Sequence, residues 1–268
     1  MPATRAYTAA ELIAAAGIPG LRPQVLVPTA RRGRDAIAGG ARFLVYVLSA
    51  SEAHSRSNVR RAVAESMEDY ARLLDALPAD AGLRINLATA FDCPFEGRMP
   101  AGPVLDLIGR LAALRPDVEI CLCDTMGRAT PDHVGQLAAA AMAAPPRETG
   151  WAYHAHDTYG LGPATAHATY PEGVRVFDAA AGGLGGCPFA PGTTGNVATE
   201  DVVWMFERMG IGTGVDLGAL LPVAQGAAAL PGASASRRRR AALGTGNPAA
   251  GAATSAGGCD LQAEGGQR

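Results

Sequence analysis

Two histidines separated by one residue, His154 and His156, are the side chains in this sequence best suited to hold a metal ion. They lie in residues 151–157, which the pattern predicts to be a short β-strand, and residues two apart on a strand point to the same face. Two imidazoles on one face can bind a single divalent metal, and the amide oxygen of Asn196 could supply a third ligand. Cys187 follows on a glycine-rich loop that would let its thiol close over a substrate and give or take a proton. The spacing therefore indicates a metal site with an acid–base group beside it.

Each feature also has an ordinary interpretation. A His-x-His pair can be a satisfied structural pair, and a glycine run before Cys-Pro is more often a turn than a catalytic lid. The combination is more specific, because three blocks resemble 3-hydroxy-3-methylglutaryl-CoA lyase. They are His-Ala-His-Asp-Thr-Tyr-Gly at 154–160, Ala-Gly-Gly-Leu-Gly-Gly-Cys-Pro-Phe-Ala-Pro-Gly at 181–192, and Gly-Asn-Val-Ala-Thr-Glu-Asp at 195–201.

The resemblance implies a divalent cation, Mg²⁺ or Mn²⁺, held by His154, His156 and Asn196. It implies cleavage of an acyl-CoA substrate by retro-Claisen chemistry, in which Cys187 protonates the enolate carbon. His154, Asp124 and Glu200 are the further candidates for ligation, substrate orientation or proton handling. Ser49 and Arg31 are candidates for substrate contact, Arg31 because the family often has a basic residue near it, although a solvated helix face is the more ordinary interpretation. Family members are commonly dimers, so a homodimer is the expected assembly.

Composition sets the outer limits. The chain has 268 residues, is 48% hydrophobic and carries a formal net charge of -2, which suits one large domain with a tail. No apolar run reaches the roughly 18 residues of a membrane span, and no secretory signal pattern begins the sequence, so we expect a cytoplasmic protein that does not contact membranes. The five scattered cysteines indicate free thiols rather than disulfides or a structural zinc site. Four arginines at 237–240 without interleaved aromatics indicate a solvated charge run and not a nucleic-acid site.

Strands and helices alternate six times along the chain, which predicts a parallel sheet with helices outside it. The predicted strands are 24–28, 43–48, 83–89, 118–123, 151–157 and 174–178, and the predicted helices are 29–39, 58–76, 103–114, 131–143, 163–170 and 220–230. Polar residues at the ends of these strands, Ser49, Asp124 and His154, are typical of the active face of a TIM-type barrel. We expect a (β/α)8 barrel over 1–230 that is incomplete in this chain, with two strand–helix units lacking before Gln24. Residues 231–268, rich in Gly, Ala and Arg, should be disordered.

One family landmark has no counterpart. The first strand of the family ends in Arg-Asp-Gly, whose Asp binds the metal and whose Arg stabilises the enolate, whereas Arg34-Asp35 here lies inside a helix and is followed by Ala36. Loss of such a donor costs on the order of 100- to 1,000-fold in rate. We therefore expect these 268 residues to cleave substrate poorly, through a start assigned too far downstream or a true truncation.

Two alternatives stay open at this point. One is a Claisen-condensing synthase of the isopropylmalate or citramalate type, which shares the His-x-His strand but lacks the Cys-Pro loop. The other is a non-catalytic truncated paralogue. Cys121 and Cys123 alternate with Leu122 and Asp124, so if Asp124 points into the barrel, both thiols point out toward the helices as packing residues.

Overall fold

The computed structural model describes residues 17–143, 146–185 and 195–230 of the chain. The strands of its main sheet are β1 (Val25–Val27), β2 (Phe43–Ser49), β3 (Gly82–Ala88), β6 (Glu119–Asp124), β7 (Gly150–Ala155) and β8 (Val176–Asp178). The helices are α2 (Ala30–Ala38), α3 (Glu52–Val59), α4 (Val63–Leu74), α5 (Ala101–Leu114), α6 (Pro131–Ala143), α7 (Gly162–Thr169), α8 (Thr199–Arg208) and α9 (Leu217–Ala228). A hairpin of β4 (Asp92–Cys93) and β5 (Gly97–Arg98) and a 3-10 turn η1 (Ala181–Gly183) complete the described elements.

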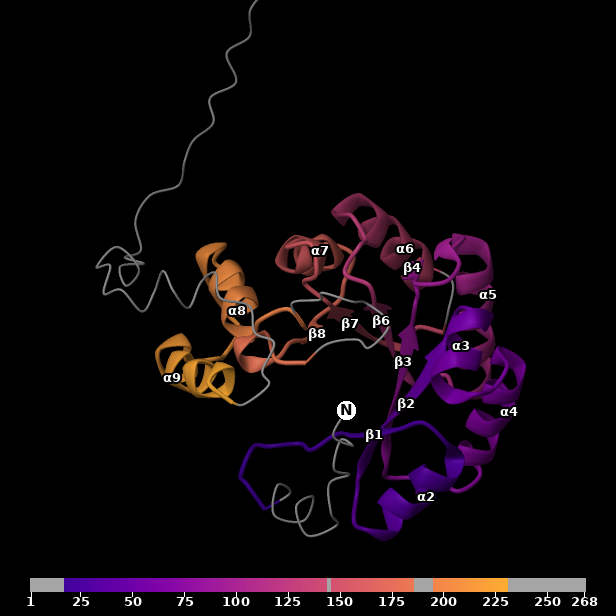
Figure 1. Cartoon of the computed structure of the whole chain (residues 1–268). Helices are drawn as coiled ribbons and strands as arrows, with labels where there is room; N and C mark the ends of the chain where they lie inside the picture. Colours follow the sequence, from indigo (N-terminus) through magenta and orange to yellow (C-terminus); the bar gives the residue numbers. More distant parts are fainter. Residues whose placement is uncertain (1–16, 144–145, 186–194, 231–268) are drawn as a thin grey trace, which may run out of the picture.

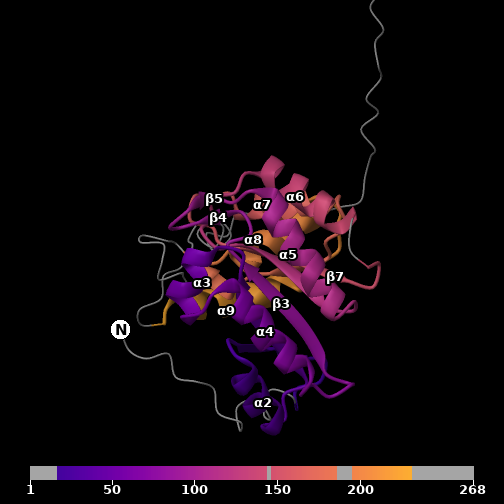
Figure 2. The ribbon, with the colours of Figure 1, turned by 90° about the vertical axis from the view of Figure 1, so that its right-hand side faces the viewer.

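The six strands of the main sheet are all parallel and follow one another in the order β1-β2-β3-β6-β7-β8. The helices form an arc around the outside of the curved sheet (Figure 1), and a view turned by a quarter shows α4 and α5 in front of β3 (Figure 2). Each strand is joined to the next by a helix, the connection that parallel pairing requires. The predicted α/β fold with six strand–helix units of a TIM-type barrel is confirmed. Within the described ranges the sheet does not close, because β1 and β8 each pair with a single strand.

The two faces of this sheet have different chemistry. One face packs against the helices and contributes apolar side chains such as Tyr46, Ile85, Leu122 and Tyr153 to the main hydrophobic core. The opposite face, called here the inner face, carries the residues that alternate with these. Its members include Arg84, Cys121, Cys123, Ala152, His154 and Asp178.

The prediction that Cys121 and Cys123 point toward the helices is wrong. Both thiols lie in a small cluster with Ala152, separate from the main core, and Cys121 Sγ is 3.9 Å from the Asp178 carboxylate. The prediction assumed that Asp124 points into the barrel. Asp124 instead belongs to the helix-facing set of β6, and its carboxylate turns into the loop that follows the strand.

The predicted helix 58–76 corresponds to α4, and a separate helix, α3, precedes it. Helix α3 starts earlier, at Glu52, because the Ser51 side chain caps it by accepting a hydrogen bond from the His54 N–H at 3.0 Å. It stops at Arg60, which adopts a left-handed conformation with φ 57°. Helix α4 then restarts after Ala62, whose N–H donates to the Glu65 carboxylate at 2.6 Å. Helix 131–143 is found at its predicted bounds, and the other predicted strands and helices are found with bounds shifted by a few residues.

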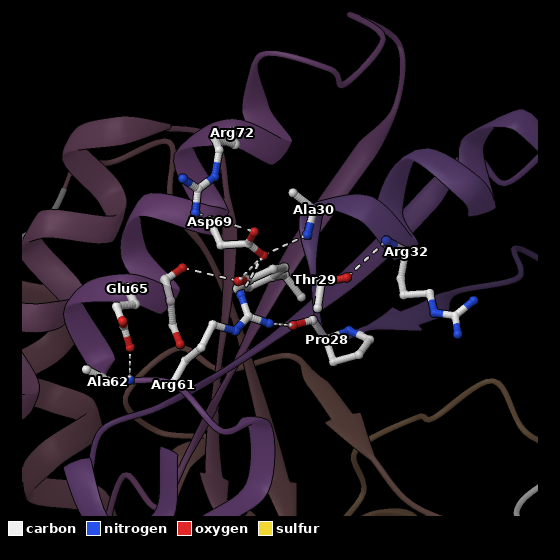
Figure 3. A network of polar contacts seen from close by, with 11 residues as sticks. Pro28, Thr29, Ala30, Arg32, Arg61, Ala62, Glu65, Asp69 and Arg72 are labelled. Carbon is white, nitrogen blue, oxygen red and sulfur yellow. Dashed lines mark hydrogen bonds and ion pairs between the residues drawn. The ribbon is translucent and has the colours of Figure 1, made fainter. Parts of the chain in front are cut away.

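A polar network holds the end of β1 against α4 (Figure 3). The Asp69 carboxylate on α4 accepts from the Ala30 N–H at 2.7 Å and from the Tyr46 hydroxyl at 3.0 Å, and it pairs with Arg61 at 2.9 Å. Arg61 also donates to the Pro28 carbonyl at 2.8 Å. The first turn of α2, which carries Arg31, is therefore held by the Asp69 carboxylate together with the Thr29 cap, whose side chain accepts from the Arg32 N–H at 3.0 Å.

Candidate metal and substrate site

The two histidines lie where the strand pattern places them. His154 is on β7 and His156 follows its end, both on the inner face, and their ring centres are 5.2 Å apart. A metal–nitrogen bond of about 2.1 Å puts an ion about 3.2 Å from each ring centre, so two imidazoles on one ion lie about 4.5–5.2 Å apart. The observed separation lies at the upper end of this range.

The electrostatics of the two rings differ. Burial, and next the neighbouring His154, lower the pKa of His156 to about 4, so this ring is neutral at physiological pH. For His154, burial alone lowers the pKa, but the adjacent Asp178, Cys123 and Asp124 together raise it above the ordinary value. Neutral imidazole is the form that ligates a metal, so His156 is ready to bind and His154 must first lose a proton when it carries one.

Asn196 is brought to the histidines by the backbone. Residues Asn196 and His156 form an isolated antiparallel bridge, and the Asn196 amide nitrogen donates to the Leu184 carbonyl at 2.7 Å. Because the nitrogen is committed to that bond, the amide oxygen is the atom left for a ligand. Gly195 permits this approach, since its φ is +103° and a Cβ there would lie 2.2 Å from the Gly183 carbonyl oxygen.

Ser49 and Asp124 are the last residues of β2 and β6, and both side chains are hydrogen-bonded within the chain. The buried Asp124 carboxylate accepts from the N–H groups of Arg128 at 3.2 Å and Ala129 at 3.1 Å. Burial raises its pKa to about 6 in spite of these donors. The Ser49 hydroxyl lies 2.7 Å from Nδ1 of His54, and both side chains are buried. Asp124 thus shapes the loop after β6 and titrates near pH 6, while Ser49 is tied to α3.

The remaining predicted residues lie farther out or outside the described part. Glu200 on α8 is buried, and its carboxylate accepts from the Gly182 N–H at 3.0 Å, which supports the glycine-rich turn η1. Arg31 is exposed on α2, within a helix whose own start is held by Asp69. Cys187 and the expected disordered tail, 231–268, lie outside the described residues. The predicted roles of all these residues stay predictions.

The donor set suits a divalent ion in part. Among residues 17–143, 146–185 and 195–230, no three or more His, Cys, Asp or Glu side chains converge on one point, so the two imidazoles stand without a directly ligating carboxylate. Nδ1 of His154 and Nδ1 of His156 are both buried and have no hydrogen-bond partner in the same ranges, an unmet need that a bound ligand would relieve. His154, His156 and the Asn196 oxygen would hold the ion.

Sequence reasoning missed the polar residues that surround His154. Asp178 ends β8 directly beside His154 in the strand register, and Arg84 reaches it from β3. The available signal was the position of Asp178 as the last residue of a predicted strand, the same signal that singled out Ser49 and Asp124.

No helix in the described part of the chain is long and apolar enough to cross a membrane.

Fold and site together define a class: a parallel barrel-type α/β protein with a histidine pair at the carboxyl end of a strand. Residues 13–226 match the HMGL-like family model. Over 207 residues the chain is 39% identical to a hydroxymethylglutaryl-CoA lyase of Bacillus subtilis, covering 77% of this chain and 69% of that protein. The chain belongs to the HMGL-like family.

Two further comparisons bear on the site. A (R)-citramalyl-CoA lyase of Chloroflexus aurantiacus is 39% identical over 201 residues, covering 73% of this chain and 62% of that protein. The solved structure of an HMG-CoA lyase from Acinetobacter baumannii, in complex with coenzyme A and 3-methylmalate, is 35% identical with a TM-score of 0.73, covering 79% of this chain and 69% of that one. The chain thus spans about two thirds of the length of these relatives.

Proposed function

We propose that this chain is a carbon–carbon lyase that cleaves 3-hydroxy-3-methylglutaryl-CoA to acetyl-CoA and acetoacetate, with Mg²⁺ or Mn²⁺ bound by His154, His156 and Asn196. The observation that carries the proposal is the imidazole pair on the inner face, 5.2 Å apart, in a chain whose family relatives are lyases. An acyl-CoA substrate is supported by the related structure with coenzyme A bound.

The reaction needs one proton removed and one returned. A base takes the proton of the tertiary hydroxyl, the bond to the adjacent methylene breaks, and its electron pair passes to the thioester to form the enolate of acetyl-CoA. An acid then protonates the enolate carbon, the role assigned to Cys187. A divalent ion held by His154, His156 and Asn196 would lower the pKa of the hydroxyl. Asp124, whose pKa is raised to about 6, titrates near neutral pH, but its carboxylate is turned into the loop after β6 and supports that loop.

The second candidate is cleavage of (R)-citramalyl-CoA, favoured by the equal 39% identity to the lyase of that name. The two acids differ by one methylene, and one methylene in a pocket separates substrates by about 10- to 200-fold. The isopropylmalate or citramalate type of synthase and a non-catalytic paralogue are the remaining alternatives. A cytoplasmic location, a homodimer and slow turnover by these 268 residues stay predictions.

The test compares both thioesters on one preparation. The purified chain is incubated with Mn²⁺ and each acyl-CoA, and acetyl-CoA and the released keto acid are followed by chromatography. We expect acetoacetate from hydroxymethylglutaryl-CoA, a loss of at least 100-fold in His154→Asn and His156→Asn, and little change in His167→Asn on α7, the matched control. Full activity in both site variants would exclude the proposed site. Faster release of pyruvate from citramalyl-CoA would favour the second candidate.

A further inference from the structure

Four ionisable side chains form a line across the inner face from β3 to β8. Arg84, with a side chain only 3% exposed, hydrogen-bonds through Nε to Glu119 and donates through an Nη to Asp178 Oδ1 at 2.7 Å. The second Asp178 oxygen, Oδ2, lies 3.4 Å from Nδ1 of His154, at ion-pair distance. Asp178 therefore joins a buried cation to a proposed metal ligand.

The strand register explains why these residues meet. Arg84 pairs with Glu119 across β3 and β6, and His154 pairs with Asp178 across β7 and β8. The small side chains of Cys121 and Ala152 occupy the paired positions between the two rows, which leaves the guanidinium room to extend across the sheet. The line is built from residues up to 94 positions apart in sequence.

The charged side chains along the line include one more negative than positive group. Arg84 contributes one positive charge, and Glu119 and Asp178 contribute two negative charges, so the set carries a net charge of -1 beside His154. The guanidinium of Arg84, 2.7 Å from Oδ1, stabilises the ionised form of Asp178. Asp178 is thus an ionised acceptor that faces a ring nitrogen.

An ionised acceptor at Nδ1 selects one tautomer of a neutral imidazole. With the proton on Nδ1, the lone pair is on Nε2, the atom that would then face a metal ion. The second histidine provides an internal comparison. Within the described ranges neither Nδ1 makes a hydrogen bond of ordinary geometry, but only Nδ1 of His154 has a carboxylate at ion-pair distance.

We propose that Asp178, anchored by Arg84, is a positioning residue: it holds the neutral His154 ring with its proton on Nδ1 and presents Nε2 to the divalent ion. This inference rests on the proposed metal-dependent function for the ion, but the tautomer is a property of the metal-free chain. Asp178 also places a negative charge 3.4 Å from Nδ1 of His154, whereas the neutral ligands His154, His156 and Asn196 carry no charge themselves.

The experiment uses the full chain and two readouts. Imidazole ¹⁵N shifts of the metal-free protein at pH 8 report the tautomers of His154 and His156, and the His154→Asn variant assigns the signals. Manganese EPR measures the Kd for Mn²⁺ alone. In the wild type we expect His154 with its proton on Nδ1. In Asp178→Asn we expect a shift toward the Nε2–H tautomer at His154 and none at His156, with a 10- to 100-fold higher Kd, the usual cost of losing such a partner.

Glu119→Gln is the matched control, because it removes a carboxylate from the same line without touching His154. Its Kd should stay within threefold of the wild type. A wild-type His154 with the proton on Nε2 would overturn the proposal by itself. The proposal can therefore be tested even if the Asp178→Asn variant fails to fold. Unchanged tautomer and Kd in a folded Asp178→Asn would overturn it as well. If the wild type binds no Mn²⁺, the metal-dependent function fails, and the tautomer still decides the role of Asp178.

Discussion

Replacing Asp69 with alanine should lower the free energy of unfolding by about 3 kcal/mol. This carboxylate accepts from the Ala30 N–H, the Tyr46 hydroxyl and Arg61 at 2.7 to 3.0 Å, and the residues around it are largely buried. Hydrogen bonds to a charged group contribute about 1.5–3 kcal/mol each, but the three share one acceptor, and Arg61 is 22% exposed and can regain water. The more distant pair with the exposed Arg72, at 3.7 Å, adds little.

A second substitution at the same position separates charge from hydrogen bonding. Asp69→Asn keeps an acceptor for Ala30 and Tyr46 but removes the charge facing Arg61, so we expect a loss of about 1–1.5 kcal/mol. The pKa of Asp69 is lowered in the fold: burial alone raises it, and the Ala30 N–H, Arg61 and Tyr46 outweigh burial. The stabilisation by its charge is therefore complete above the unfolded pKa of about 3.8 and is lost as the pH falls through the lower folded value.

Urea unfolding followed by circular dichroism at pH 7 measures both variants, and the larger loss corresponds to a fall in Tm of about 6–12 °C for a chain of this size. Asp35→Ala is the control, since its pair with Arg32 is long, at 3.8 Å, and both side chains are more than half exposed. It should change stability by less than about 0.5 kcal/mol. An Asp69→Ala loss no larger than that of Asp35→Ala would refute the reasoning that the Asp69 carboxylate stabilises the start of α2.

Three further predictions concern the site. The affinity for Mn²⁺ should rise tenfold per pH unit up to the pKa of His154, which is raised above 6.5, and then level off. His156, with a pKa of about 4, stays neutral throughout this range. EPR titration from pH 5.5 to 8.5 checks this expectation, and a flat profile would contradict it. The Asp124 carboxyl carbon should titrate near pH 6 by ¹³C NMR, and an ordinary midpoint near 4 would show that burial does not control this group. Gly195→Ala should weaken Mn²⁺ binding at least tenfold by pushing Asn196 away from His156. The control is Gly109→Ala in α5, where an added Cβ meets no other atom. It should leave Mn²⁺ binding unchanged and raise the free energy of unfolding by about 0.5–1 kcal/mol.

Much of the fold was predictable because its signals are local. Apolar runs such as 43–48 and 118–123 predict strands buried on both faces, and helix 131–143 is found at its predicted bounds. The shared face of His154 and His156 follows from the two-residue period of a strand alone. Helix α3 was not predicted, because its polar sequence shows no apolar stripe and its stability comes from the Ser51 cap and from Glu96, which accepts from the Ala53 N–H at 3.2 Å across 43 residues.

Tertiary structure alone decided which way the site faces. Alternation along β6 shows that Cys121 and Cys123 share a face, but the side on which the helices pack depends on every strand of the sheet, so the thiols proved to lie on the inner face. The strand order likewise brings Arg84 to Asp178 over 94 residues of sequence and Asp178 to His154 over 24. Periodicity is set by neighbouring residues, whereas the side chains that meet across a sheet are set by its register and curvature, and these arise only when all the strands have paired.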